Sequence, residues 1–218
     1  MIAWRDLPAD LRLLYSPIGL LLVDDLTGRS SFGAIDAILE LQGGAEWREV
    51  VFSSVVTASG ILIFPGLGRS VDVTQPPQRY RVRLRSALYR PLYQATVDGI
   101  EFDVPPYNDT SPPAMPTNRP TRTVLLPAAN YPYAAYLPVV RGTVEDSVGN
   151  PLPDVLVQES MRERTITDGR GAFSLSMRWV PVGAPAQITA DDLRGGRSGA
   201  VTITLPGALD KSQTITVT

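Results

Sequence analysis

The sequence contains no cysteine and no histidine. Without cysteine there is no disulfide, no thiolate nucleophile and no cysteine-ligated metal. Without histidine the chain lacks the usual general base and the commonest metal ligand. Catalysis would depend on carboxylates, hydroxyl groups, tyrosines and a single lysine, Lys211. We therefore expect a protein that is not an enzyme and that holds no metal and no cofactor.

An excess of one charge and long apolar runs are also lacking. The 20 positive and 22 negative side chains leave a net charge of −2, so no basic field attracts nucleic acid and we expect no nucleic-acid partner. Residues 18–23 are apolar but far too few to cross a bilayer, which predicts no membrane insertion. Asp6 and Asp10 interrupt the stretch where a secretory signal has its apolar core. We expect synthesis in the cytoplasm without a signal peptide.

Adjacent carboxylates are the remaining candidates for chemistry. Asp24 and Asp25 are neighbours, as are Asp191 and Asp192. Neighbouring residues on a strand point to opposite faces, so adjacency does not make a catalytic dyad, and both pairs are expected to be turn residues. Asp168 begins an Asp-Gly-Arg-Gly sequence that could supply one calcium ligand. The acidic loop of a calcium site does not accompany it, so a tight turn is favoured.

The sequence is rich in β-strand pattern, most clearly in residues 139–178. Phe173, Leu175 and Met177 alternate with small polar residues, which is the period of two of a half-buried strand. Sequences dense in Gly, Pro, Asn and Asp separate this strand from those before it. The pattern predicts an all-β sandwich in which Val144 and Phe173 point inward.

Two turns in this region have a specific spacing. The positions concerned are Gly142, Val144, Gly149, Pro151, Leu152, Val155 and Val157, followed by Thr167, Asp168, Gly169, Gly171 and Phe173. On these residues the chain from about 138 to 218 resembles the carboxypeptidase regulatory-like, or transthyretin-like, domain. The resemblance implies a β-sandwich over residues 139–218 and an accessory role. The resemblance does not imply carboxypeptidase activity, because that activity needs zinc bound partly by histidine and the sequence has no histidine.

The rest of the chain predicts a second sandwich. Residues 1–14 have apolar side chains at helical spacing, namely Trp4, Leu7, Leu11 and Leu14. An N-terminal arm and a short helix both remain open there. Residues 15–104 contain short alternating segments separated by turns, which predicts an N-terminal β-sandwich. The expected fold class is therefore all-β, with two antiparallel sandwiches, Ig-like or transthyretin-like, joined by an extended segment.

Residues 105–138 contain nine of the 20 prolines. Proline fixes φ and has no amide donor, which argues against a helix or a central strand and predicts a proline-rich linker. The segment also carries Tyr131, Tyr133 and Tyr136. Aromatic side chains would not stabilise a linker that packs against nothing. It is expected to lie either against its own domains or against another subunit.

A stripe of arginines is the most conspicuous polar feature. Arg79, Arg81, Arg83 and Arg85 occupy alternate positions and share one face of a predicted strand. This Arg stripe suits three alternatives, namely a solvated face with internal carboxylate partners, a contact with another subunit, and phosphate binding. Together with Tyr131, Tyr133 and Tyr136 it forms the candidate interaction surface.

Two functions from different classes follow. The first is a structural protein of a large assembly, such as a phage tail, a baseplate or a contractile injection particle. Such a protein would bind other subunits, including copies of itself in a homo-oligomer, and would be incorporated into a virion or an injection particle. The alternative is a carbohydrate- or cell-surface-binding adhesin with Tyr131, Tyr133 and Tyr136 as its platform. A regular particle that contains the chain would favour the first function, and a monomer that binds a glycan the second.

Overall fold

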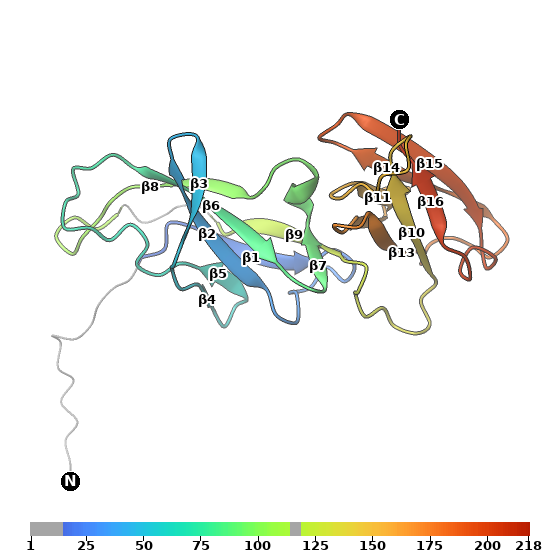
Figure 1. The fold of residues 1–218 in the computed structure, drawn as a ribbon. Coiled ribbons are helices and arrows are strands. Elements are labelled where there is room, and N and C mark those ends of the chain that lie inside the picture. The colour runs from blue at the N-terminus through green and yellow to red at the C-terminus, as the bar shows by residue number, and fades with distance from the viewer. Residues whose placement is uncertain (1–14, 114–118) are drawn as a thin grey trace, which may run out of the picture.

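A computed structural model describes residues 15–113 and 119–218. The predicted arm or short helix at residues 1–14 lies outside this range. The described part contains sixteen strands and one short 3-10 helix, η2 (Leu92–Ala95), which confirms the all-β fold class. Figure 1 shows these strands gathered into two bodies that follow one another along the long direction of the molecule.

The N-terminal body is a sandwich of two sheets. One sheet has the order β4 (Val55–Val56), β5 (Ile61–Ile63), β1 (Gly19–Asp24), β9 (Thr121–Pro127) and β7 (Tyr89–Pro91). The other has the order β3 (Glu46–Val50), β2 (Asp36–Gly43), β6 (Gln78–Arg85) and β8 (Ile100–Val104). Leu20, Leu39 and Val82 are buried between the sheets, because alternate residues of a strand face the same side.

The C-terminal body is a second sandwich. Its smaller sheet has the order β13 (Ala172–Ser176), β10 (Val139–Glu145) and β16 (Gln213–Thr216), and its larger sheet has the order β12 (Glu163–Ile166), β11 (Leu156–Glu159), β14 (Pro185–Asp192) and β15 (Arg197–Thr204). Val144 and Phe173 are 0% and 1% exposed in its core, which confirms their predicted inward placement. Pairing is mostly antiparallel, except that β1 pairs with β9 and β10 pairs with β16 in parallel.

The turn before β13 has the chemistry that its sequence predicted. The Asp168 carboxylate accepts the backbone N–H groups of Arg170 and Ala172 at 2.8 and 2.9 Å. Gly171 has φ +70°, and a Cβ there would lie 2.6 Å from the carbonyl oxygen of Val144. Only glycine tolerates both conditions. The Asp168 carboxylate therefore closes a tight turn, as predicted.

The structure corrects the boundaries of the proline-rich linker. Residues 121–127 lie inside the segment 105–138 that was expected to be linker, yet they form β9 in the interior of a sheet. Proline occurs only before this strand, at Pro120, and at its last position, Pro127, so every interior residue keeps the amide group that pairing requires. The first sandwich therefore extends past residue 104, and only residues 128–138 connect it to β10.

Phe173→Ala is expected to lower the free energy of unfolding by about 3–5 kcal/mol, because the change leaves a cavity in a closed core. Denaturant titration of the full chain measures this loss. Val182→Ala is the control, since that side chain is 79% exposed and its truncation should change stability by less than about 0.5 kcal/mol. A loss below about 1 kcal/mol for Phe173→Ala would contradict the inward placement.

Candidate functional site

Strand β9 brings the two bodies together. Its Leu126 packs against Ile166 of β12 and Ala95 of η2, and none of the three is more than 1% exposed. Val124 and Leu156 are partly buried against the same cluster. Removing this apolar surface from water stabilises the contact by about 25 cal/mol per Å². We call this contact between the bodies the domain junction.

Three ion pairs cross the domain junction. Arg164 of β12 lies 2.5 Å from Asp25, and Arg90 of β7 lies 2.5 Å from Asp154. A more exposed pair joins Arg194 to Asp98 at 3.0 Å. The side chains of Arg164 and Asp25 are only 28% and 14% exposed, so water and salt screen this pair less than a surface pair. Each pair joins one residue of the first body to one of the second.

Hydrogen bonds to backbone oxygens strengthen the domain junction. Thr165 Oγ1 donates to the Pro127 carbonyl oxygen at 2.7 Å, and Arg178 Nη1 donates to the Leu26 carbonyl oxygen at 2.9 Å. The connecting segment is held too, since Tyr133 Oη donates to the Ser174 carbonyl oxygen at 2.9 Å. Apolar packing, ion pairs and directional hydrogen bonds together hold the two bodies in one relative arrangement.

Asp24 is a buried carboxylate next to the domain junction. It is 0% exposed and accepts hydrogen bonds from Tyr131 Oη at 2.7 Å and Tyr89 Oη at 3.1 Å. It also accepts the Leu26 N–H at 2.8 Å, which is the turn role that the sequence predicted. Since a buried charge must be hydrogen-bonded, Asp24 orders both tyrosines, and the turn interpretation was incomplete.

The environment of Asp24 suppresses ionisation of the surrounding phenols. Burial, together with the neighbouring Asp24 carboxylate, raises the pKa of Tyr89 to about 12. Burial and the hydrogen bond to Asp24 likewise raise the pKa of Tyr131. Such groups are poor acids and bases at neutral pH, so the cluster is suited to holding structure and not to transferring protons.

The Arg stripe is paired within the protein. Arg81 and Arg83 both contact Glu40, at 2.6 and 2.7 Å, and Arg79 contacts Glu101 at 2.8 Å. The register explains this, because Glu40 of β2 lies opposite Arg81 of β6. Arg85 is exposed at the end of the strand. Of the three alternatives for the stripe, the one with internal carboxylate partners matches this geometry. The middle of the face is covered and not solvated, since the Arg81 and Glu40 side chains are 12% and 6% exposed.

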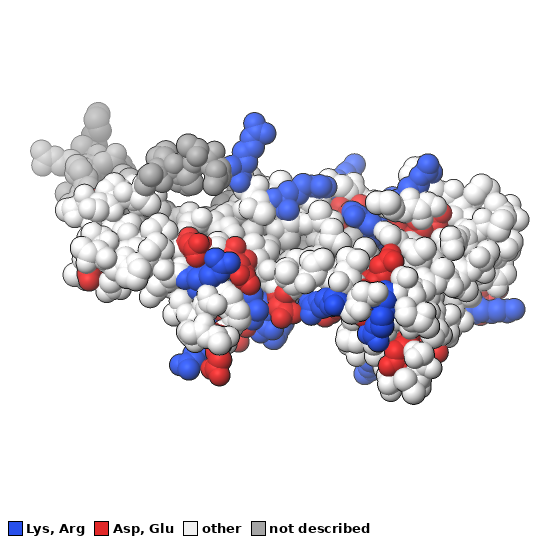
Figure 2. All heavy atoms as spheres, turned by 90° about the horizontal axis from the view of Figure 1, so that it is seen from above, with Lys and Arg blue, Asp and Glu red and all other residues white. Residues whose placement is uncertain are grey.

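The face drawn in Figure 2 shows the same mixing of charges. Much of that face is uncharged, and positive and negative side chains lie side by side in its lower half, without a large area of one sign. A surface of this kind offers no strong field for a polyanion.

The three candidate tyrosines do not form one surface. Tyr131 is 8% exposed against Asp24. Tyr133 is partly buried against the core of the N-terminal sandwich, and its hydroxyl bonds to the C-terminal body. Tyr136 is 85% exposed. The segment therefore lies mainly against its own domains, and only Tyr136 remains as an accessible contact residue.

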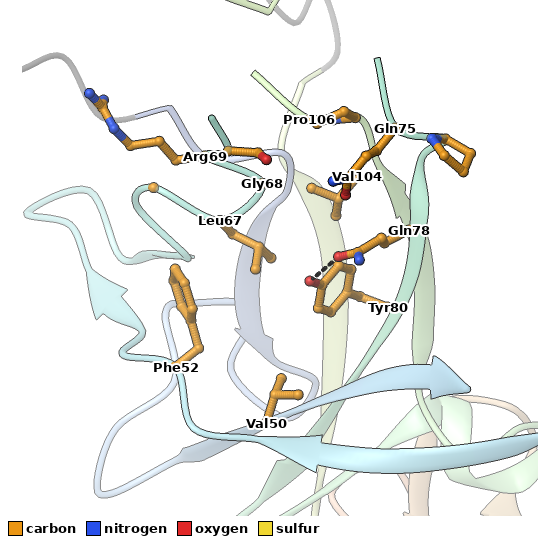
Figure 3. Close-up of a pocket in the computed structure, with 13 residues that line it drawn as sticks. Val50, Phe52, Leu67, Gly68, Arg69, Gln75, Gln78, Tyr80, Val104 and Pro106 are labelled. Atoms are coloured by element: carbon orange, nitrogen blue, oxygen red, sulfur yellow. Dashed lines mark hydrogen bonds between the residues drawn. The ribbon is translucent and has the colours of Figure 1, made fainter. Parts of the chain in front are cut away.

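A pocket opens at the edge of the N-terminal sandwich (Figure 3). It has a volume of about 280 Å³ and is lined by Phe52, Leu67, Tyr80 and Val104, among others. The Tyr80 hydroxyl donates to Gln78 Oε1 at 2.9 Å. Among the residues that the structure describes, Arg69 is the only charged one that lines the pocket. A pocket without a carboxylate can hold an apolar side chain but offers no acid–base pair.

Exposed apolar side chains mark other parts of the surface. The loop between β13 and β14 carries Trp179 and Val182, which are 59% and 79% exposed. Met161 and Leu193 are 78% and 52% exposed. Sequence reasoning did not single out these four residues, because an isolated apolar residue in a turn carries no periodic signal.

No metal-binding group of three or more Asp and Glu side chains occurs within residues 15–113 and 119–218. In the same ranges, no helix is long and apolar enough to cross a membrane.

Raising the pH above about 10 is expected to destabilise the protein. The unfolded chain releases the Tyr89 proton near pH 10.0, whereas the folded chain keeps it until about pH 12. Stability is therefore fully present below the lower value and is lost as the pH rises toward the upper one. Denaturant titrations at about pH 9 and pH 11.5 measure this loss, which should be smaller in Tyr89→Phe. Equal losses in both proteins would contradict the assignment.

Arg164→Ala and Asp25→Ala are expected to be non-additive. A double-mutant cycle should give a coupling free energy of about 0.5–3 kcal/mol, because the two side chains form one partly buried pair. Small-angle scattering of each variant would report whether the two bodies keep their arrangement. The control cycle uses Arg48 and Glu46, a pair whose side chains are 76% and 75% exposed, and should give a coupling near zero. Equal coupling in both cycles would contradict a special role for the domain junction.

No protein-family model matches the sequence, and no curated protein matches it. Among solved structures, the chain is similar to the major pilin subunit BcpA of Bacillus cereus, with 13% identity and a TM-score of 0.30 over 92% of this chain and 68% of that chain. A likeness at this level supports no argument about fold or function. The resemblance of residues 138–218 to the carboxypeptidase regulatory-like domain stays a prediction.

Proposed function

We propose that this protein is a non-enzymatic structural subunit that binds other protein subunits of a larger assembly, including copies of itself. The domain junction is the observation that carries the proposal. Interfaces between domains of one chain usually permit relative motion. Here an apolar cluster, three ion pairs and several hydrogen bonds join the bodies. A subunit that transmits position or force needs such a fixed geometry.

The distribution of polar and apolar groups supports binding over catalysis. Most of the arginines in the stripe are used in internal pairs, and the buried carboxylate Asp24 is used to order tyrosines. The groups left at the surface include Trp179, Val182 and Tyr136, which are exposed and apolar or aromatic. Aromatic side chains of this kind are the usual anchors of protein interfaces.

The assembly that we propose is a phage tail, a baseplate or a contractile injection particle. A cysteine-free chain folds in a reducing cytoplasm without disulfide formation, which suits a particle that is assembled there. The resemblance of residues 138–218 to a carboxypeptidase regulatory-like domain fits an accessory or adaptor module in such a particle. The protein would then be incorporated into a virion or an injection particle.

The adhesin alternative is less well supported, because its three tyrosines do not form one exposed surface. It required Tyr131, Tyr133 and Tyr136 to present their rings together, whereas Tyr131 is buried and Tyr133 packs on the core of the N-terminal sandwich and donates a hydrogen bond to Ser174. A single exposed ring, that of Tyr136, is a weaker basis for binding a glycan. The structural function therefore has the better support.

The test is association of the full chain, followed by sedimentation velocity and negative-stain microscopy. Concentration-dependent oligomers or a regular particle are expected. Replacing both Trp179 and Val182 with serine should weaken association at low and high salt alike, because an apolar contact is not screened. Val71→Ser is the matched control, since Val71 is 100% exposed on the N-terminal body. A monomer at every concentration that binds a glycan array would overturn the proposal in favour of the adhesin.

A further inference from the structure

The edge of β9 that faces away from β1 is only partly paired. Strand β1 pairs with β9 from Thr121 to Leu125 on one edge, and β7 pairs with it only from Leu125 to Pro127 on the other. The chain leaves β7 at Pro91 and turns into η2. In the part of the chain that the structure describes, no strand therefore lies beside residues 121–124 on that edge. An edge of this kind can pair with an extended segment of another chain.

The backbone groups of Arg122 point to this open edge. The Leu125 carbonyl oxygen accepts the Asp25 N–H at 3.0 Å, so Leu125 turns its backbone groups toward β1. Along a strand these groups alternate between the two edges. Arg122 lies three positions earlier, so it presents its N–H and C=O to the edge without a strand. The backbone of an added strand would pair with this donor and this acceptor.

One surface hollow runs along the open edge. It has a volume of about 580 Å³ and is lined by four consecutive residues, Thr121, Arg122, Thr123 and Val124. Consecutive side chains of a strand point to opposite faces. A hollow that touches all four therefore lies beside the edge of the strand and reaches both faces of the sheet. An extended segment in this hollow would occupy the place of the next strand.

The hollow has walls from both bodies. Its apolar lining includes Leu92, Tyr93 and Ile100 of the first body and Leu156, Met161 and Leu193 of the second. Met161 and Leu193 are 78% and 52% exposed, so an occupant can cover both. Mostly apolar clefts of about 300–1,000 Å³ between domains are preferred places for binding. An occupant would bury apolar surface of both bodies at once, next to the domain junction.

A buried hydroxyl in the hollow lacks a hydrogen-bond partner. Thr123 is 6% exposed and lines the hollow, and its Oγ1 has no partner among the described residues. Buried side-chain polar atoms nearly always have a partner. The Thr123 hydroxyl thus points to a group that the described chain does not supply. A serine or threonine directly opposite on an added strand would make this bond.

The charges around the hollow favour an acidic occupant. Among the described residues, Arg122 and Arg164 line the hollow and no Asp or Glu does. Arg164 is already paired with Asp25. Arg122 is exposed on β9 and makes no ion pair with the described residues. A carboxylate opposite Arg122 on an added strand would complete a cross-strand pair of opposite charge.

We propose that the hollow binds an extended acidic segment of a partner protein, which adds to β9 as an antiparallel strand. The inference rests on the proposed function, since it names how another subunit is held. The added strand continues the line of β7, which is antiparallel to β9. It places a carboxylate opposite Arg122, a hydroxyl opposite Thr123, and apolar side chains opposite Thr121 and Val124. Main-chain hydrogen bonds hold the segment, and these side chains select it.

Disulfide capture tests the site, because the natural chain has no cysteine. Full-length Met161→Cys places a thiol beside the hollow. The probe is the blocked peptide Val-Thr-Asp-Val with a Gly-Gly-Cys end, whose tether raises the effective concentration of a short segment. In a thiol buffer at equilibrium, we expect at least about tenfold more mixed disulfide than with Val-Thr-Lys-Val on the same end. Equal capture of the two peptides overturns the proposal.

A second thiol position is the matched control for this capture. Val182→Cys is exposed on the C-terminal body, where the native side chain is 79% exposed, and it does not line the hollow. It should capture the acidic and the basic peptide alike. A preference for the acidic peptide as strong as that of Met161→Cys would show a general effect of charge and overturn the assigned site.

Methylation of the peptide backbone distinguishes an added strand from docking by side chains alone. Alternate N–H groups of the bound peptide face β9. N-methylation of one alternate set should therefore abolish the preferential capture, whereas methylation of the other set should not. Equal effects of the two sets refute the added strand.

Charge reversal tests the role of Arg122. In the Met161→Cys chain, Arg122→Glu should reverse the preference from the acidic to the basic peptide. Arg85→Glu is the control, since Arg85 is exposed on the opposite sheet, and it should leave the preference unchanged. An unchanged preference after Arg122→Glu overturns the proposal.

Hydrogen exchange of the natural chain alone identifies a competing occupant. Protection of the Arg122 amide that rises with the concentration of the chain would show that a second copy fills the hollow, and would refute a separate partner. If the acidic peptide is not preferred while copies of the chain still associate, the strand site is refuted and the structural function stands. If the chain stays a monomer that binds glycans, the proposed function itself fails.

Discussion

Strand β9 is the element on which the rest of the structure depends. Adjacent residues of a strand point to opposite faces, and β9 uses both faces. Leu125 is 1% exposed in the core of the first sandwich, and Leu126 is 0% exposed in the domain junction. One strand therefore closes one hydrophobic core and begins the contact with the other body. Residues 121–124 of β9 also line a surface hollow of about 580 Å³.

The polar groups around β9 stabilise this arrangement and leave little for chemistry. Asp24 sits in the neighbouring strand, fully buried, with two phenol hydroxyls and a turn amide on its carboxylate. Asp25 follows immediately and pairs with Arg164 of the other body. The two adjacent carboxylates thus have different structural roles. Asp24 orders two tyrosines of the first sandwich, and Asp25 binds an arginine of the second body. The two sandwiches are thus held in a fixed arrangement by this use of charge.

Much of the C-terminal body could be predicted from the sequence, because its signals are local. The alternation around Phe173 and the Asp168 turn involve residues that are close in the chain, and the structure confirms both. The candidate interaction surface could not be predicted in the same way. Arg81 donates a hydrogen bond to Glu40, which is 41 residues away in the sequence. Tyr131 donates one to Asp24, which is 107 residues away. A periodic pattern in the sequence does not predict a contact between residues that are so far apart in the chain.

The sequence by itself determined the β class, the core positions of the second sandwich, and the lack of cysteine and histidine chemistry, since composition and a period of two require no knowledge of distant contacts. Only the tertiary structure decided that residues 121–127 are a strand within a proline-rich segment, because the parallel partner β1 begins about a hundred residues earlier. It also decided which arginines are paired and which tyrosine is exposed. Those outcomes depend on register and packing between segments that are remote from one another in the chain.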